Sequence, residues 1–258
     1  MIFDKYEIYS LLNKMKSVEE NHRKENDCND SDTMVPRVTE VLSSTIHEDG
    51  LMNWANGLGW KRVSYRSFMR EAADKGTYSH LAIEKYIREG SIDISSMRIV
   101  SDTIRNTVIS CLDGFIQWWN KIHSEYKDIK VVYLEETLIH DYFRGTCDCL
   151  LNVDGRYWLI DFKTSNHMNY KYTLQLAAYR FLLRELRGID VTKCSVLKLD
   201  KVNHSYSEYT LDLKNEEHSK FIDECEETFM LLNLGYRMRL QNTDEYHKIF
   251  GIKPYKVK

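Results

Sequence analysis

Hydrophobic residues recur at helical spacing through the first half of the chain. Apolar positions three and four residues apart predict helices over residues 6–23, 51–60 and 99–126. Thr39 and Ser64 are predicted to cap two more helices, because a hydroxyl oxygen accepts hydrogen bonds from the free N–H groups of a first turn. We therefore expect the front half to be mostly helical.

After residue 130 the spacing of apolar residues changes from helical to alternating, which is the period of a β-strand. The second half is predicted to follow the order β-β-β-α-β-β-α. Strands are expected at 130–140, 145–153, 156–163, 191–199 and 206–212, and helices at 170–186 and from 215 to about 239. This order predicts an α/β fold with a mixed central sheet flanked by helices.

Composition favours one large domain with a short N-terminal extension. The chain has 258 residues, of which 43% are hydrophobic, enough to bury a sizeable core. We expect residues 1–34 to hold the first helix and a charged, Asn/Asp-rich connection that ends near Asp32. A single domain follows over residues 35–258, with a helical part at 35–128 and the sheet core and C-terminal helix at 129–258.

Charge and cysteine content exclude several classes of protein. The net charge of −3 gives no general attraction for nucleic acid, so DNA binding would require a local basic patch or bound metal ions. The six cysteines form no Cys-x-x-Cys pair, which argues against a zinc knuckle. No stretch reaches the ~18 apolar residues of a membrane span, and the N-terminus lacks the apolar run of a signal peptide. We expect an intracellular, cytoplasmic protein without membrane contact.

The most informative local signal is Asp154-Gly155 between two apolar runs, which predicts a β-hairpin with a two-residue turn. Such a turn fixes the register, so Asp148 is predicted to lie directly opposite Asp161. Cys147 and Cys149 flank Asp148 and are expected on the other face of the strand as buried apolar fillers.

Two aspartates in this position repel each other, so folding alone gives no reason to place them there. A divalent cation between the carboxylates would remove the repulsion. Lys163 follows Asp161 by two residues and is predicted on the same face, where its ammonium group can polarise water or stabilise charge on a phosphoryl oxygen. The alternative is an ordinary hairpin that ends in solvated charges.

The residues around the hairpin follow a recognisable order: Gly145 and Asp148, then Asp161, Lys163 and Thr164, then Gln175 and Tyr179. This order, in the segment GTCDCLLNVDGRYWLIDFKTSNHMNYKYTLQLAAYRFL, resembles the core of the PD-(D/E)XK nucleases. It is most similar to the RecB-like exonucleases, a group that includes the mitochondrial genome-maintenance exonuclease and phage relatives. The resemblance implies a restriction-endonuclease-like core.

Two upstream blocks, PRVTEVLS and KGTYSHLAIEKYI, resemble the entry segment and the histidine-bearing helix of the same family. By this resemblance Mg²⁺ or Mn²⁺ is bound by His80, Asp148, Asp161 and the backbone carbonyl of Phe162. Glu136 occupies the place where related sequences carry one more acidic residue. Glu135 is the alternative, because the choice depends on the strand register.

The predicted helix after the hairpin carries Gln175 and Tyr179 one turn apart among apolar residues. The resemblance implies that Gln175 reaches toward the active centre as a catalytic residue and that Tyr179 supports the helix or touches the nucleic acid. Packing alone is the alternative explanation for the tyrosine.

A basic, aromatic segment precedes the histidine helix. The candidate nucleic-acid-binding residues there are Arg62, Arg66, Arg70 and Lys75, interleaved with Trp60, Tyr65 and Phe68. Phosphate contacts combined with base stacking describe a path for single-stranded DNA. The alternative is a solvated helix face whose cations are balanced by Glu71 and Asp74.

Together these features predict a Mg²⁺- or Mn²⁺-dependent DNA exonuclease that acts on single strands or free ends, in a bacterial or phage-infected cell. The resemblance implies a role in replication, repair or recombination, with single-strand-binding, annealing or replication proteins as partners. The alternatives are an endonuclease on the same core and a catalytically inactive DNA-binding module.

Overall fold

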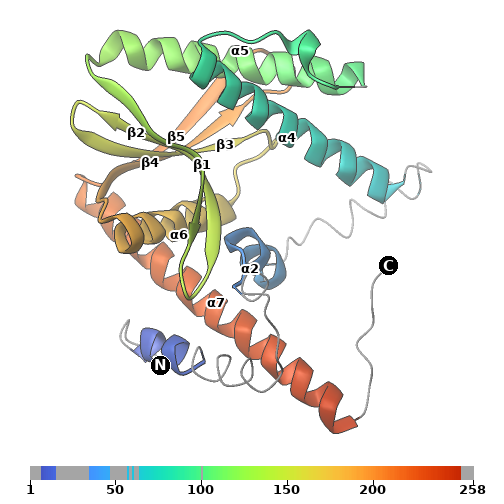
Figure 1. Ribbon diagram of the computed structural model, residues 1–258, viewed down its shortest axis with the longest axis vertical. Coiled ribbons are helices and arrows are strands. Elements are labelled where there is room, and N and C mark those ends of the chain that lie inside the picture. Colours follow the sequence, from blue (N-terminus) through green and yellow to red (C-terminus); the bar gives the residue numbers. More distant parts are fainter. Residues whose placement is uncertain are drawn as a thin grey trace.

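The computed structural model describes residues 7–15, 35–46, 57, 60, 64–99 and 101–250, without the side chains of residues 244 and 246–250 (Figure 1). The predicted Asn/Asp-rich connection, most of the predicted helix at 51–60, and Arg62 lie outside this range. Within it, no helix is both long enough and apolar enough to cross a membrane.

A five-stranded mixed sheet forms the centre of the molecule, in the order β1-β2-β3-β4-β5. Its strands are β1 (Ile129–Ile139), β2 (Arg144–Val153), β3 (Arg156–Lys163), β4 (Val191–Leu199) and β5 (Tyr206–Asp212). Only β3 and β4 pair in parallel, because α6 (Tyr170–Arg187) crosses over between them; the other neighbours are antiparallel. The predicted α/β fold with a mixed sheet is confirmed.

Helices cover both faces of this sheet (Figure 1). On one face, α4 (Tyr65–Glu89) and α5 (Asp102–Glu125) enclose a core around Phe115, Trp118 and Phe162. On the other face lie α2 (Val38–Thr45), α6 and α7 (Glu216–Phe250). Helical residues 7–15 join this second core through Ile8 and Leu12. A short 3-10 helix, η1 (Ile94–Ser96), connects α4 to α5.

Capping residues set the helix starts, with one departure from prediction. The Ser64 hydroxyl oxygen accepts a hydrogen bond from Ser67 N, as expected for the cap of α4. The first residue of α2 is Val38 and its cap is Arg37, so the prediction that Thr39 caps this helix is wrong. Glu40 replaces the hydroxyl, because its carboxylate accepts from Arg37 N at the helix start.

The hairpin between β2 and β3 has the predicted register. Val153 pairs with Arg156, and Leu151 with Trp158. Asp154 and Gly155 have φ values of 47° and 80°, the left-handed conformations that a type I′ turn requires. The turn thus fixes which residues of β2 and β3 are neighbours.

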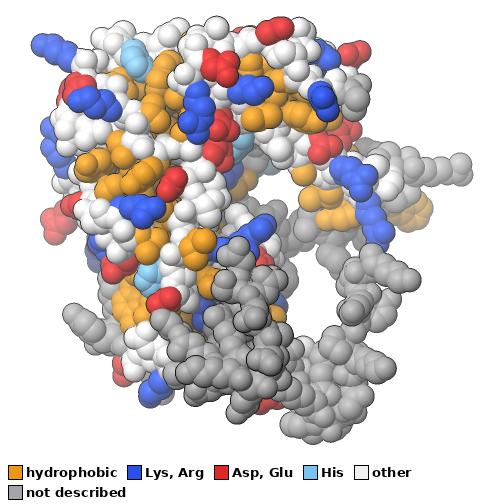
Figure 2. Space-filling model, viewed as in Figure 1, with side chains coloured by type: hydrophobic (Ala, Val, Ile, Leu, Met, Phe, Trp, Pro, Cys, Tyr) orange, Lys and Arg blue, Asp and Glu red, His pale blue; other side chains and the backbone are white. Residues whose placement is uncertain are grey.

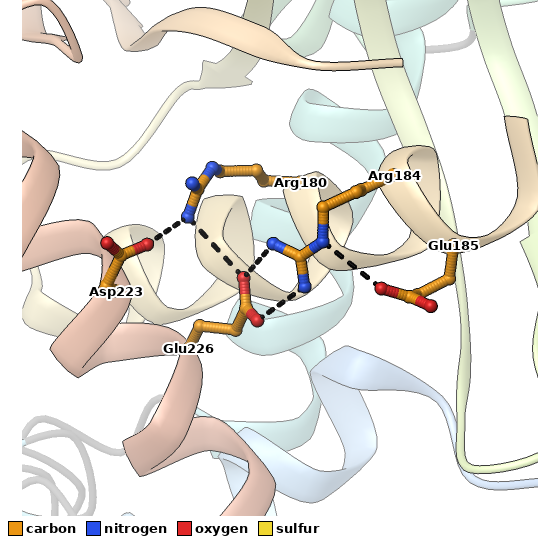
Figure 3. A network of polar contacts seen from close by, with 5 residues as sticks. All are labelled: Arg180, Arg184, Glu185, Asp223 and Glu226. Atoms are coloured by element: carbon orange, nitrogen blue, oxygen red, sulfur yellow. Dashed lines mark hydrogen bonds and ion pairs between the residues drawn. The ribbon is translucent and has the colours of Figure 1, made fainter. Parts of the chain in front are cut away.

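Helix α7 extends beyond the predicted end near residue 239, to Phe250. A network of ion pairs joins it to α6 (Figure 3). At its centre the buried Glu226 carboxylate accepts hydrogen bonds from Arg184 at 2.8 and 3.1 Å and from Arg180 at 3.5 Å. Asp223 completes the network by accepting from Arg180 at 2.6 Å. A buried carboxylate needs such partners, so the network fixes how α7 packs on α6.

Candidate active centre

The β2–β3 ladder stops one pair before the two aspartates would meet. The last paired residues are Cys149 and Ile160. Beyond this pair no ladder partner joins Asp148 to Asp161, and Asp148 Oδ2 accepts a hydrogen bond from Phe162 N at 2.7 Å. The predicted direct pairing of Asp148 with Asp161 is therefore wrong, although both lie at the same end of the hairpin. The hydrogen bond from Phe162 N stabilises the Asp148 carboxylate.

The cysteines on either side of Asp148 lie in two different parts of the core. Cys147 and Cys149 are fully buried, as predicted for apolar fillers. They do not share one face, however: Cys147 packs in the core with α6, and Cys149 in the core with α5. Simple alternation fails at this point because Asp148 lies where the β2–β3 ladder ends.

Asp161 and Lys163 form a close, buried ion pair at the end of β3. Asp161 Oδ2 lies 2.6 Å from Lys163 Nζ, and the Lys163 ammonium also lies 5.1 Å from the centre of the Tyr172 ring. Burial raises the pKa of Asp161 to about 6, against the opposing effect of Lys163. Burial lowers the pKa of Lys163, but Asp161 and Asp148 outweigh it and the net shift is upward. The lysine is therefore a cation at neutral pH.

His80 approaches these groups from α4. Its Nε2 lies 3.1 Å from the Phe162 carbonyl oxygen. Its Nδ1 lies 3.3 Å from Glu135 Oε1 and 3.7 Å from Asp148 Oδ1. Burial disfavours the charged imidazole, but the two carboxylates exceed that effect and raise the pKa of His80 to about 9. The histidine thus stands in a strongly negative environment.

The acidic residue that β1 contributes to this cluster is Glu135. Its neighbour Glu136 points elsewhere and accepts a hydrogen bond from Arg187 Nη2 at 3.1 Å. The expectation that Glu136 belongs to the centre is corrected by the backbone: the β1 register shifts between Val131 and Tyr133, and Glu135 has a φ of 52°. A left-handed residue in a strand re-aims its side chain, which alternation cannot reveal.

The donor set fits a hard divalent cation. One ligand atom each from His80, Glu135 and Asp148 all lie within 4.8 Å of one another, and the Phe162 carbonyl is beside the imidazole. Asp161 is not a member of this group, although its Oδ1 has no hydrogen-bond partner among the described residues. Several oxygen ligands and one imidazole are the chemistry that Mg²⁺ and Mn²⁺ accept.

Gln175 and Tyr179 lie beneath the centre on α6. Gln175 Nε2 donates to the Tyr179 hydroxyl at 2.8 Å, and both side chains are buried. The Tyr179 ring fills the space beside Gly145, where any Cβ would overlap with it. Tyr179 is only 3% exposed, a position that does not fit the expected contact with nucleic acid. It supports the strand that carries Asp148.

The described basic residues of the predicted DNA path lie along the first half of α4. Arg66 and Arg70 are exposed there. Lys75 is half-buried, and its Nζ lies 2.7 Å from Glu71 Oε1. Tyr65 and Phe68 are 39% and 43% exposed. In Figure 2, hydrophobic and Lys or Arg side chains gather over the end of α4 that projects from the body.

Tyr172 also belongs to the centre, although no sequence pattern singles it out. Its ring faces the Lys163 ammonium and so holds the lysine beside Asp161. A tyrosine near the start of the predicted helix was visible in the sequence, but only the path of the chain between β3 and α6 brings its ring to the lysine.

Comparison with known proteins identifies one family whose model matches most of the chain. The model of the PD-(D/E)XK nuclease superfamily matches residues 57–247. No curated protein sequence matches the chain at a significant level. Among solved structures, the protein SSO0001 has 14% sequence identity and a TM-score of 0.30, covering 86% of this chain and 85% of that one. A phage-related exonuclease from Haemophilus somnus 129PT has 9% identity and a TM-score of 0.31, covering 80% of this chain and 96% of that one.

Proposed function

We propose, from the premise that this chain belongs to the PD-(D/E)XK nuclease superfamily, that it is a Mg²⁺- or Mn²⁺-dependent DNA exonuclease. Family membership makes it a nuclease, that is, a phosphodiester hydrolase. The preference for DNA, for single strands or free ends, and for these ions is our proposal. We further propose a role in replication, repair or recombination.

One observation carries this proposal: three elements bring one metal-binding residue each to a small cluster, and a fourth places a backbone carbonyl beside it. His80 comes from α4, Glu135 from β1, Asp148 from β2 and the Phe162 carbonyl from β3. Carboxylates held this close need a positive charge beside them. The imidazole of His80, with its pKa raised to about 9, supplies that charge here, and a divalent ion bound to the same atoms would take over this role. The end of the β2–β3 ladder at Cys149 and the left-handed Glu135 support the same conclusion, because the backbone departs from regular pairing where these groups meet.

A bound divalent ion would supply a water of lowered pKa and would withdraw charge from the phosphate. The chain's own residues would position the water, stabilise developing charge and hold the site in place. Lys163, a cation at neutral pH, can hold the attacking water or stabilise the negative charge that develops on a phosphoryl oxygen. Asp161 fixes the position of that ammonium through the 2.6 Å contact, and Tyr172 holds it from another side. Gln175 and Tyr179 keep the Asp148 strand in place.

The first half of α4 supports single-stranded DNA as the substrate. Arg66 and Arg70 lie one turn apart, and each repels the other unless an anion lies between them. The exposed rings of Tyr65 and Phe68 alternate with these cations along α4. Phosphate contacts combined with stacking on aromatic rings are typical of binding to a single strand.

The exonuclease proposal is tested with linear and circular single-stranded DNA of the same sequence. With Mg²⁺ or Mn²⁺ we expect the linear strand to be digested and the circle to stay intact, and with EDTA we expect neither to be cut. Cleavage of the circle would favour the endonuclease alternative. Binding of DNA without cleavage under any metal would favour the inactive module.

A further inference from the structure

Lysines gather at the edge of the sheet beside the active centre. Lys163 and Lys198 are register partners at the carboxyl ends of the parallel strands β3 and β4. Register partners on parallel strands point to the same face, so Lys198 lies next to Lys163. In α/β sheets, ligands bind outside the carboxyl ends of parallel strands.

Two more lysines reach this edge from other elements. Lys201 follows the end of β4. Lys75 belongs to the turn of α4 that crosses the end of β3. The next residue, Gly76, is so close to this end that a Cβ on it would lie 3.7 Å from Thr164 Oγ1. Burial lowers the pKa of Lys201, and Lys75 and Lys198 lower it further, against the opposing effects of Cys111 and Asp200.

The position of Lys201 is fixed by contacts of its own turn with α5. Ser110 Oγ donates to the Asp200 carbonyl oxygen at 2.9 Å and accepts from His204 N at 2.9 Å. A Cβ on Gly114 would overlap with the backbone of Ser205, so α5 and the turn touch without intervening side chain. The turn is therefore a rigid support and not a free loop.

Acidic partners are scarce at this edge. Lys75 forms an ion pair with Glu71. The side chains of Lys198 and Lys201 form no ion pair or hydrogen bond with the part of the chain that the structure describes. The Asp200 carboxylate is the acid beside them. It accepts hydrogen bonds from Val202 N and Asn203 N at 2.8 and 2.7 Å, and it acts on both lysines through its charge without forming an ion pair with either. Elsewhere several lysines do pair with a carboxylate, at positions 121, 130, 193 and 220.

We propose that Lys75, Lys198 and Lys201 form a lysine rim that binds the phosphodiester backbone of a single strand next to the scissile phosphate. This inference rests on the proposed function and extends its DNA path from the first half of α4 to the β4 side of the active centre. Like-charged side chains on three converging elements repel one another, and a polyanion removes that repulsion. A single surface lysine has no such repulsion and therefore gives no reason to expect a bound polyanion.

The test compares two double variants with the same change in charge. Lys198→Gln/Lys201→Gln removes two rim cations, and Lys121→Gln/Lys220→Gln removes two exposed lysines from α5 and α7. Binding of a fluorescent linear oligodeoxythymidylate is measured in EDTA, which prevents hydrolysis, over a series of NaCl concentrations. The KM for the same strand is then measured with Mg²⁺.

We expect the rim variant to bind about tenfold more weakly and the control to stay within about twofold of wild type. The slope of log affinity against log salt should decrease by roughly 1.4 in the rim variant, because each phosphate contact on a single strand contributes about 0.7. KM should rise in proportion. Lys198→Arg/Lys201→Arg keeps both charges and should restore binding, and thermal unfolding verifies that all variants are folded.

Equal affinity and equal salt slope in the rim and control variants would overturn the rim while leaving the nuclease proposal intact, provided the wild type still digests the strand. A wild-type protein that neither binds nor hydrolyses the strand would instead remove the proposed function, and the rim with it. The two failures are therefore distinguishable.

Discussion

At the residue scale, the centre depends on which of two adjacent glutamates faces His80. Glu135 lies 3.3 Å from the imidazole, whereas Glu136 pairs with Arg187 on the outside of the strand. The side chains have the same chemistry and differ by one position, so they form a matched pair for mutation. Their comparison tests the geometry of the site with little change in composition.

Glu135→Gln should raise the Mg²⁺ concentration needed for half-maximal hydrolysis by about 10- to 100-fold, the range seen when a group that holds a metal site is removed. Glu136→Gln should leave the metal requirement unchanged, because its carboxylate contacts only Arg187 among the described residues. Metal titrations of hydrolysis on one linear strand measure both. The reverse result, with Glu136→Gln as the damaging change, would refute the assignment.

The sequence predicts which residues of β2 and β3 lie in the active centre. For β1 it leaves Glu135 and Glu136 as alternatives. Asp154-Gly155 determines the hairpin register, so Asp148, Asp161 and Lys163 were expected near one another and lie at one end of the hairpin. The end of the β2–β3 ladder at Cys149 and the left-handed Glu135 could not be predicted from alternation. The first accompanies the hydrogen bond from Phe162 N to the Asp148 carboxylate, and the second faces His80, which arrives from α4.

At the element scale, a glycine is required where a helix packs so closely on its neighbour that no Cβ fits between them. Gly114 in α5 touches the backbone of Ser205 in the β4–β5 turn, whereas Gly235 in α7 faces open space. The pattern of apolar residues predicts both helices, but neither this contact nor the length of α7. The predicted end near residue 239 falls short of Phe250, because an amphipathic pattern does not mark where a helix without a clear stop signal ends.

Gly114→Ala should lower the free energy of unfolding by about 1–3 kcal/mol, because the added methyl group forces α5 and the turn apart. Gly235→Ala should raise it by about 0.5–1 kcal/mol, since alanine favours a helix where nothing obstructs the side chain. Urea denaturation followed by circular dichroism measures both changes. Equal effects of the two substitutions would contradict the described packing of α5 on the turn.

At the scale of the whole molecule, charges have different roles at the β5 edge of the sheet and in the active centre. At this edge the half-buried Glu208 carboxylate accepts hydrogen bonds from Trp118 on α5 and Ser195 on β4, and it lies 3.1 Å from the Lys193 ammonium. Every one of these contacts satisfies the carboxylate within the fold. In the active centre, burial raises the pKa values of Asp148 and Asp161, against the opposing effects of His80 and Lys163.

Glu208 should make stability depend on pH. Burial raises its pKa, but Lys193 and the hydrogen bonds outweigh it, so the folded pKa lies below the ordinary 4.5. The resulting stabilisation is fully present above pH 4.5 and disappears as the pH falls through the lower folded value. The stability difference between wild type and Glu208→Gln, from urea unfolding at pH 3 to 7, should therefore shrink in acid. A constant difference would contradict this.

The central claim is that Asp161 and Lys163 belong to the active centre of a metal-dependent nuclease. Its most direct test is the Mg²⁺-dependent digestion of linear single-stranded DNA by wild type, Asp161→Asn and Lys163→Ala at equal concentrations of folded protein. We predict activity only with metal, and a loss of at least about 100-fold in each variant with DNA affinity within a few-fold of wild type. Variants that digest DNA at the wild-type rate, or a wild type that is active in EDTA, would contradict the claim.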